Sequence, residues 1–326
     1  MDEFQIIKKY FLPLTNKASA AANLEDDVAK ISLKKNEYLV LSKDLIIEDI
    51  HFKKADRAYK IASKLLLTNL SDLAASGAKP LYYMLGFSSG KNPDEKFIAD
   101  FCSGLKDVSK KYKISLIGGD SISSPDRLFF SITIFGIKNK NDANLKRSSG
   151  EKEDLIFVSG TIGDAFLGLQ ISKNKLPKNN YLLSRHFFPT AQIKLGNSLA
   201  KNKLANAAID ISDGLLADLN HICQTSKLDA IIHQDKIPLS KEARLFLKHN
   251  SNFSISDLIS GGDDYELIFS VNKKFQKEIE TLSKKLRTPL TCIGKLTKPK
   301  SKQPKISLLN SLDQPIAISE YGYKHF

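Results

Sequence analysis

The sequence has no tryptophan and only three cysteines, Cys102, Cys223 and Cys292. They lie far apart, without the close pairs typical of zinc sites or disulfide frameworks, so we expect reduced, mostly buried thiols. No apolar run approaches the roughly 20 residues that cross a bilayer. The N-terminal stretch MDEFQIIKKYFLP has acids at positions 2 and 3 and no long apolar segment, which is not typical of a secretory signal. We therefore expect a cytoplasmic protein with no membrane partner.

The common nucleotide-binding and catalytic signatures are also absent. The sequence has no Walker A loop, and the glycine-rich SGTIGDAFLG (159–168) lacks the spacing of the dinucleotide fingerprint. Neither a Gly-x-Ser-x-Gly elbow nor a protein-kinase catalytic loop occurs. Any phosphate chemistry must therefore use another architecture.

The charge balance is strongly basic, with 49 Lys and Arg against 36 Asp and Glu, a net charge of +13. Such a balance can indicate a nucleic-acid partner. A lysine-rich solvated surface is the favoured interpretation, because the lysines are spread along the expected helices and the tract 295–305. A positive surface would also suit anionic phosphorylated substrates. We expect no nucleic-acid partner.

Apolar β-branched runs alternate with segments of helical periodicity over 326 residues, enough for two domains. Strands are predicted at 38–42, 81–87, 114–119, 128–137, 154–160, 207–212, 230–234 and 265–271. Helices are predicted at 57–76, 93–112, 164–172, 190–202, 215–226 and 273–286. The polar stretch 138–154 predicts a linker. We therefore expect an α/β (α+β) protein with domains at 1–147 and 148–326.

Acidic residues recur within or after apolar segments of this basic chain. They are Asp26, Asp27, Asp44, Glu48, Asp49, Asp72, Asp120, Asp210, Asp213, Asp263, Asp264 and Glu266. Carboxylates that converge on one cleft repel each other unless a cation neutralises them. Oxygen ligands suit magnesium, which brings phosphates with it, so the pattern indicates metal-assisted phosphoryl transfer.

Several of these residues also have a simpler explanation. Asp26, Asp56 and Asp213 could be helix N-caps, Asp120 a turn residue, Glu48 a solvated strand-edge charge and His51 a packed or surface histidine. Asp72 resists such an explanation, because it lies in the middle of a predicted helix beside Leu70 and Leu73.

Several motifs occur in a familiar order: EFQIIKKYF, DDVA, DLIIEDIHF, NLSDLAASGAKP, LIGGD, DISDGLLADL, GGDDYEL and a C-terminal GYKHF. The chain resembles the thiamine-monophosphate kinases, members of the superfamily of aminoimidazole-ribonucleotide synthetases, from about residue 3 to residue 326. NLSDLAASGAKP and DISDGL mark the superfamily, whereas the HF, GGDDYEL and GYKHF elements point to the kinases within it.

The resemblance implies an aminoimidazole-ribonucleotide synthetase-like fold, whose N-terminal domain forms a β-barrel across a homodimer and whose C-terminal α/β domain completes the site. It implies direct in-line transfer of the ATP γ-phosphoryl group to thiamine phosphate, with several Mg²⁺ ions and often K⁺. By resemblance, the metal ligands are Asp27, Ser42, Asp44, Asp72, Asp120, Asp210 and Asp213. The ATP contacts are Gly119, Asp120, Arg147 and Ser212, and the thiamine-phosphate contacts are His51, Asp263 and Tyr323.

The sequence departs from the family pattern at three places. Asn23-Leu24-Glu25 replaces Gly-x-Gly before Asp26, Lys43 replaces a hydroxyl residue, and Cys102 replaces a tyrosine near the adenine. The alternatives are another ATP-dependent enzyme of the superfamily, acting by amide-oxygen activation or selenide phosphorylation, a nucleic-acid-binding protein, or a relative without turnover.

Overall fold

The computed structural model describes residues 2–90, 94–250, 253–318 and 320–323. The chain divides into two compact units. Unit 1 contains Met1–Leu73 and Ala78–Lys140, and unit 2 contains Ala74–Gly77 and Asn141–Phe326. Arg147, which we assigned to the N-terminal domain, is therefore part of unit 2. The stretch between Asn139 and Leu155, predicted as a linker, contains only turns and one isolated bridge, Lys146 to Ala207.

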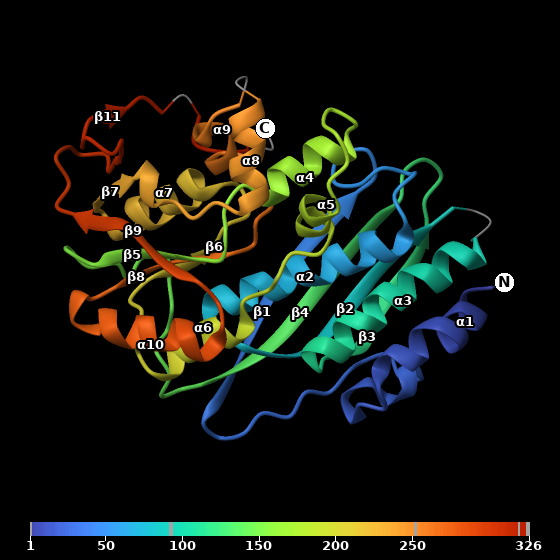
Figure 1. Ribbon diagram of the computed structural model, residues 1–326. Coiled ribbons are helices and arrows are strands. Elements are labelled where there is room, and N and C mark those ends of the chain that lie inside the picture. The colour runs from blue at the N-terminus through green and yellow to red at the C-terminus, as the bar shows by residue number, and fades with distance from the viewer. Residues whose placement is uncertain (1, 91–93, 251–252, 319, 324–326) are drawn as a thin grey trace. The chain divides into compact units, whose positions relative to one another are not determined.

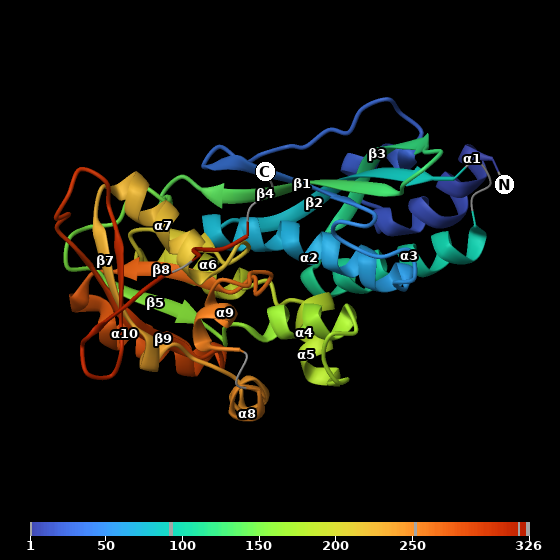
Figure 2. The ribbon, with the colours of Figure 1, turned by 90° about the horizontal axis from the view of Figure 1, so that it is seen from above.

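Unit 1 is built on a four-stranded sheet in the order β1-β4-β2-β3. The strands are β1 (Glu37–Ile47), β2 (Lys79–Ser89), β3 (Ser115–Ser123) and β4 (Phe129–Asn139). Only β2 and β3 pair in parallel among these four strands. Helices α2 (Ala58–Ser76) and α3 (Glu95–Tyr112) lie on one face of this sheet (Figures 1 and 2). Short helical turns precede β1: α1 (Glu3–Ile6), Ile7–Phe11, Leu12–Thr15 and Ser19–Leu24.

Alternation along the strands separates the two faces of the unit 1 sheet. In β4, Phe130, Ile132 and Ile134 are fully buried, and the residues between them are half-buried. Phe130 packs on Phe101 of α3, with ring centroids 4.6 Å apart. In β1, the exposed positions include Leu41 and Leu45. The four strands form an open sheet within this chain, so the intersubunit barrel stays a prediction.

Unit 2 contains a seven-stranded mixed sheet in the order β11-β10-β7-β9-β5-β8-β6. Its strands are β5 (Leu155–Ser159), β6 (Ala208–Asp210), β7 (Asp229–His233), β8 (Leu267–Val271), β9 (Leu290–Thr297), β10 (Ile306–Leu309) and β11 (Pro315–Ile316). Its helices are α4 (Asp164–Ser172), α5 (Asn180–Phe187), α6 (Ile193–Lys201), α7 (Leu215–Ser226), α8 (Lys241–His249), α9 (Ile255–Ile259) and α10 (Gln276–Leu286).

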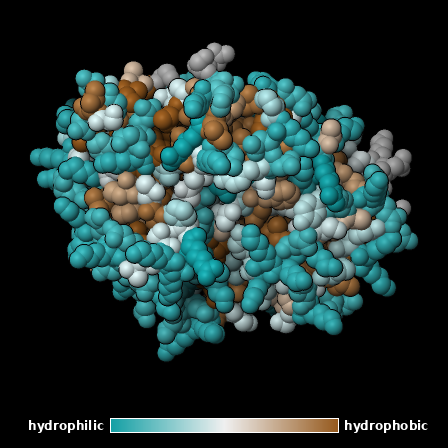
Figure 3. All heavy atoms as spheres, viewed as in Figure 1, coloured by the Kyte–Doolittle hydropathy of each residue, from teal (hydrophilic) through white to brown (hydrophobic). Residues whose placement is uncertain are grey.

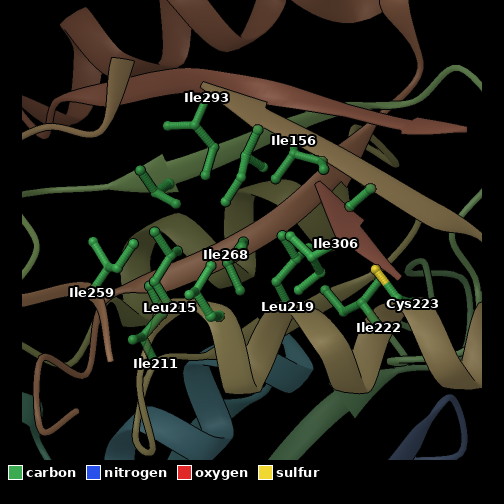
Figure 4. Close-up of a cluster of buried hydrophobic side chains, with 14 of the residues drawn as sticks. Ile156, Ile211, Leu215, Leu219, Ile222, Cys223, Ile259, Ile268, Ile293 and Ile306 are labelled. Carbon is green, nitrogen blue, oxygen red and sulfur yellow. The ribbon is translucent and has the colours of Figure 1, made fainter. Parts of the chain in front are cut away.

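Two hydrophobic cores lie on opposite faces of the unit 2 sheet. Ile156 belongs to a core with Leu215 and Leu219 of α7, shown in Figure 4. The next residue along β5, Phe157, belongs to a second core formed with α6 and α10, where it stacks on Phe269. Because successive side chains of a strand point to opposite faces, β5 has apolar residues on both faces from Leu155 to Val158.

The cysteines and the surface agree with a chain of free thiols and a largely polar exterior. Cys102 and Cys223 are buried and all three cysteines are free thiols. Burial raises the pKa of Cys102 and of Cys223 to about 12. Within the described ranges, no helix combines the length and the apolar character needed to span a membrane. Figure 3 shows hydrophilic residues over much of the face in view, with apolar patches among them.

Candidate active site

In unit 1, β1 and α2 bring three predicted metal ligands together. The Ser42 hydroxyl donates a hydrogen bond of 2.5 Å to Asp72 Oδ2. The Asp44 N–H donates to Asn69 Oδ1 at 3.2 Å. Ser42 and Asp44 share one face of β1 because they are two residues apart, and Asn69 and Asp72 share one face of α2 because they are three apart. The mid-helix acid of NLSD therefore faces the strand.

The electrostatics of this cluster suit a hard cation. Burial, and then the neighbouring Asp72 carboxylate, raise the pKa of Asp44 to about 7. The donors are oxygen atoms only, the ligand type that Mg²⁺ prefers. A bound divalent ion would remove the repulsion between the two carboxylates. The residues present thus fit the metal that the resemblance implies.

A cavity of about 170 Å³ in unit 1 holds two further predicted ligands. Asp27 and Asp120 line it together with apolar side chains such as Phe11 and Leu116. Gly119 also lines it, and a Cβ at this position would lie only 2.1 Å from the Leu85 carbonyl oxygen. The predicted strand 114–119 was too short: β3 continues to Ser123, so Asp120 lies within a strand and not in a turn.

The departures from the family pattern have local consequences. Ala22, Asn23 and Leu24 adopt left-handed φ values of 44°, 55° and 57°, although none of them is glycine. No helix begins within the described stretch 25–36, so Asp26 is not an N-cap. Lys43 lies on the face of β1 opposite to Ser42 and is exposed. Cys102 is buried and is not among the residues that line the cavity.

The segment after β1 carries the predicted substrate residue His51. Its Nδ1 accepts a hydrogen bond of 3.2 Å from the Ile47 N–H, and its side chain is on the surface. The neighbouring Glu48 is buried, and its carboxylate accepts from the Leu128 N–H at 3.0 Å. The interpretation of Glu48 as a solvated charge was therefore wrong, because its carboxylate ties this segment to the residues before β4.

In unit 2, the motif DISDG forms a turn between β6 and α7. Asp210 is buried at the end of β6. Gly214, with φ of 130°, occupies the N-cap position of α7, so Asp213 is not the cap. The turn is held by Asp218, whose Oδ2 accepts from the N–H groups of Ser212, Asp213 and Gly214 at 2.9, 3.1 and 3.2 Å.

Asp218 was not among the site residues predicted from the sequence. Burial, and then Asp213, raise the pKa of Asp218 to about 7. Its position five residues after Asp213 in DISDGLLADL was the available signal, because an acid in the first turn of a helix can accept from the free N–H groups there. Ligand atoms of Asp213, Asp218 and His221 all lie within 4.8 Å of one another, which makes a second group of potential metal donors.

The loop GGDDYE (261–266) packs directly on this turn. The Asp263 N–H donates to the Ser212 carbonyl, and the Tyr265 N–H donates to the Ile211 carbonyl, both at 2.8 Å. Gly262 has φ of 70°, and a Cβ there would lie 2.5 Å from the Ser212 oxygen. The close approach therefore requires glycine.

The C-terminal segment joins the same turn. The Tyr323 N–H donates to the Asp213 carbonyl at 3.0 Å. Residues 324–326, the last three of GYKHF, lie outside the described residues. Ser212, Asp213, Asp263 and Tyr323, which the sequence assigned to metal, ATP and thiamine phosphate, thus lie around one turn of unit 2.

Two acids of GGDDYE are buried beneath the loop. Asp264 accepts from the Gly163 and Ala165 N–H groups at the start of α4, at 2.8 and 3.3 Å. Burial raises its pKa to about 8, against the opposing effect of these hydrogen bonds and of Arg185. Glu266 accepts from Arg185 Nη2 at 2.8 Å and from Gln192 Nε2 at 2.7 Å. These contacts anchor the loop to α4 and α5.

Arg147 also belongs to unit 2. It is exposed in the connection after residue 140, and its carbonyl accepts from the Ser226 hydroxyl at 3.0 Å. The predicted site residues thus form one group in unit 1, with Asp27, Ser42, Asp44, His51, Asp72, Gly119 and Asp120, and one in unit 2, with Arg147, Asp210, Ser212, Asp213, Asp263 and Tyr323.

Comparison with known proteins gives two family matches. Residues 25–138 match the AIR synthase related protein N-terminal domain, and residues 151–306 match the AIR synthase related protein C-terminal domain. A thiamine-monophosphate kinase of Buchnera aphidicola subsp. Schizaphis graminum is 36% identical over 335 residues, covering 100% of this chain and 99% of the relative.

Solved structures agree. A crystal structure of thiamine-monophosphate kinase from Stenotrophomonas maltophilia K279a is 32% identical, with a TM-score of 0.82, covering 94% of this chain and 96% of the other. The structure of AaThiL complexed with AMPPCP and TMP is 26% identical, with a TM-score of 0.78, covering 99% and 97%. The chain therefore belongs to the thiamine-monophosphate kinase family of the AIR synthase related proteins.

Proposed function

We propose that this protein transfers the γ-phosphoryl group of ATP to the phosphate of thiamine phosphate, releasing ADP and thiamine diphosphate. Full-length relatives that bear this activity in their names support the proposal. One structural observation supports the proposal most directly. In unit 2, main-chain hydrogen bonds join the motifs DISDG and GGDDYE and the residue Tyr323.

A divalent metal ion would accompany ATP in this chemistry and would supply neutralisation of the charge that develops on the phosphates. We assign Mg²⁺ to the seven oxygen-donor residues Asp27, Ser42, Asp44, Asp72, Asp120, Asp210 and Asp213, with K⁺ as an assisting ion. The cluster of Asp44, Ser42 and Asp72 supports this assignment, since its carboxylates repel each other without a cation. The protein itself then positions the two phosphates and excludes water, more than it moves protons.

The ATP contacts proposed are Gly119, Asp120, Arg147 and Ser212. The cavity in unit 1 supports a nucleotide there, because apolar side chains such as Ile7 and Phe11 share it with Asp27 and Asp120. An adenine ring suits the apolar part, and metal-bound phosphates suit the acids. Arg147 offers a guanidinium fork that matches a phosphate.

The thiamine-phosphate contacts proposed are His51, Asp263 and Tyr323. A carboxylate and an aromatic ring suit the cationic thiazolium of thiamine, by charge and by cation–π attraction. The side chain of Tyr323 is 54% exposed and its main chain is fixed to Asp213, which supports a role in binding a ligand.

We further propose a homodimer in the cytoplasm. The exposed leucines Leu41 and Leu45, on either side of Lys43 on one face of the edge strand β1, support self-association, because large apolar side chains on an uncovered edge strand are a liability.

The test is to incubate the purified protein with ATP, Mg²⁺ and thiamine phosphate and to separate the thiamine species by chromatography. Thiamine diphosphate should appear in equal amount to ADP, and Asp72→Asn should abolish both. No thiamine diphosphate across a Mg²⁺ and K⁺ series would reject the proposal and direct attention to another acceptor.

A further inference from the structure

His186, on α5, contacts the predicted substrate residue Asp263. Its Nδ1 lies 3.3 Å from Asp263 Oδ2. The histidine is 4% exposed, and its ring packs edge-on against Phe187 with centroids 4.8 Å apart. The Asp263 side chain is 26% exposed. A buried, sterically fixed ring nitrogen therefore meets a carboxylate that is still open to solvent.

Asp263 has a left-handed backbone conformation, which costs free energy in a residue other than glycine. Its φ is 67°, in the left-handed region that non-glycine residues rarely occupy. The surrounding contacts overcome this cost: Asp264 is bound at the start of α4 and Glu266 is bound to Arg185. Because Asp264 and Glu266 anchor the loop, the orientation of the third acid, Asp263, is fixed as well.

Helix α5 contacts two acids of this loop through neighbouring residues. Arg185 binds Glu266 at 2.8 Å, and His186 reaches Asp263. Helix α5 itself lies beside α4 (Figure 1), the helix whose first N–H groups bind Asp264. Neither α5 nor a role for these two residues was predicted from the sequence, because α5 has only eight residues.

We propose that His186 is a positioning residue for thiamine phosphate, which acts by fixing the Asp263 carboxylate through a hydrogen bond from Nδ1–H. The inference rests on the proposed function, since Asp263 is there a contact of the thiamine moiety. A carboxylate with fixed orientation loses less conformational entropy when the cationic ligand binds, so the effect falls on substrate binding. His186 touches no reacting atom, and the turnover step does not depend on it.

The matched variants are His186→Asn and His186→Gln. In the Asn variant, the amide nitrogen takes the place of His186 Nδ1, so a hydrogen-bond donor to Asp263 is kept. In the Gln variant, the amide nitrogen takes the place of His186 Nε2, so the donor lies away from Asp263. Both variants replace the ring by a polar amide, so loss of the packing on Phe187 is common to both. If His186 had only a structural role, the two variants would show the same kinetic defect.

Steady-state kinetics on the full chain, with thiamine phosphate and ATP varied in turn, tests the inference. His186→Gln should raise KM for thiamine phosphate about tenfold, the effect of one charge-assisted hydrogen bond, with kcat and KM for ATP within twofold of wild type. His186→Asn should stay within threefold of wild type. Combined with Asp263→Asn, His186→Gln should add no further increase in KM.

Equal KM values for His186→Gln and wild type, or equal defects of the Asn and Gln variants, would overturn the inference while the wild type still forms thiamine diphosphate. A wild-type protein that forms no thiamine diphosphate would instead overturn the proposed function and the inference with it.

Discussion

The main-chain N–H of Tyr323 donates to the carbonyl oxygen of Asp213 at 3.0 Å, which ties the C-terminal segment to the turn that follows β6. Gly322 allows this approach, because a Cβ at position 322 would lie 2.5 Å from the same oxygen and 2.6 Å from the Ala217 Cβ. The main chain of Tyr323 is thereby held at Asp213, a predicted metal ligand.

Gly322→Ala should displace Tyr323 and raise KM for thiamine phosphate at least tenfold, with little change in KM for ATP. The reason is the clash of the new methyl group with the Asp213 carbonyl, which no side-chain rotation relieves. Steady-state kinetics and a thermal unfolding curve check this result. Gly90→Ala is the control, because a Cβ there meets no atom within 4 Å. Equal kinetics of both variants would contradict the prediction.

Asp44→Asn should stabilise the metal-free protein at pH 8 by about 2 kcal/mol, because it removes a buried charge beside Asp72. The pKa of Asp44 is raised to about 7, so its carboxylate is ionised at pH 8. The same change should lower activity at least 100-fold, since a metal ligand is lost. Urea unfolding with EDTA and a turnover assay measure the two effects. Asp126→Asn, on the surface, should change neither. Destabilisation by Asp44→Asn would argue against the repulsion.

Asp264 should make folding stability pH-dependent. Its pKa is about 8 in the folded protein against 3.8 in the unfolded chain. The folded state therefore holds the proton more tightly, so this contribution is complete below about pH 4 and is lost as the pH rises to about 8, by up to about 1.4 kcal/mol per pH unit.

Urea unfolding of wild type and Asp264→Asn at pH 5 and pH 8 tests this. The stability of wild type relative to the variant should fall by at least about 2 kcal/mol between the two pH values. Other titrating groups are common to both proteins, so the comparison isolates Asp264. A constant difference would mean that Asp264 is ionised throughout.

Ala22→Gly should increase the free energy of unfolding by about 0.5–1 kcal/mol. Ala22 is exposed and has φ of 44°, so glycine relieves a strained left-handed residue without loss of packing. Chemical denaturation measures the gain. Ala18→Gly, at φ of −62°, should instead destabilise the protein through chain entropy alone. A loss of stability in Ala22→Gly comparable to that in the control would refute the argument.

The double variant Leu41→Lys and Leu45→Lys should convert a dimer into a monomer. These side chains are 55% and 52% exposed on the outer face of β1, and charges there would oppose the association of two copies. Light scattering should give about twice 36.3 kDa for wild type and 36.3 kDa for the variant. Leu312→Lys, at a residue 74% exposed in unit 2, is the control. A monomeric wild type would reject the dimer.

Local patterns predicted the long elements well. The predicted helices 164–172 and 215–226 match α4 and α7, and all eight predicted strands are present, because their apolar residues are buried on sheets. The prediction missed α5, α8, α9 and the strands β9, β10 and β11. Most of these elements are short, and contacts within the fold contribute to their conformation beside the local pattern.

The sequence by itself determined which acids follow apolar segments and which family the motifs resemble. It also determined that Asp72 belongs to a helix. Only the tertiary structure decided which of these residues meet. Ser42 reaches Asp72 because strand and helix periodicities coincide across a packed interface, and Arg185 and His186 gain roles because buried polar and charged groups must find partners. Such pairings join residues distant in the chain, and the period of a local pattern contains no information about them.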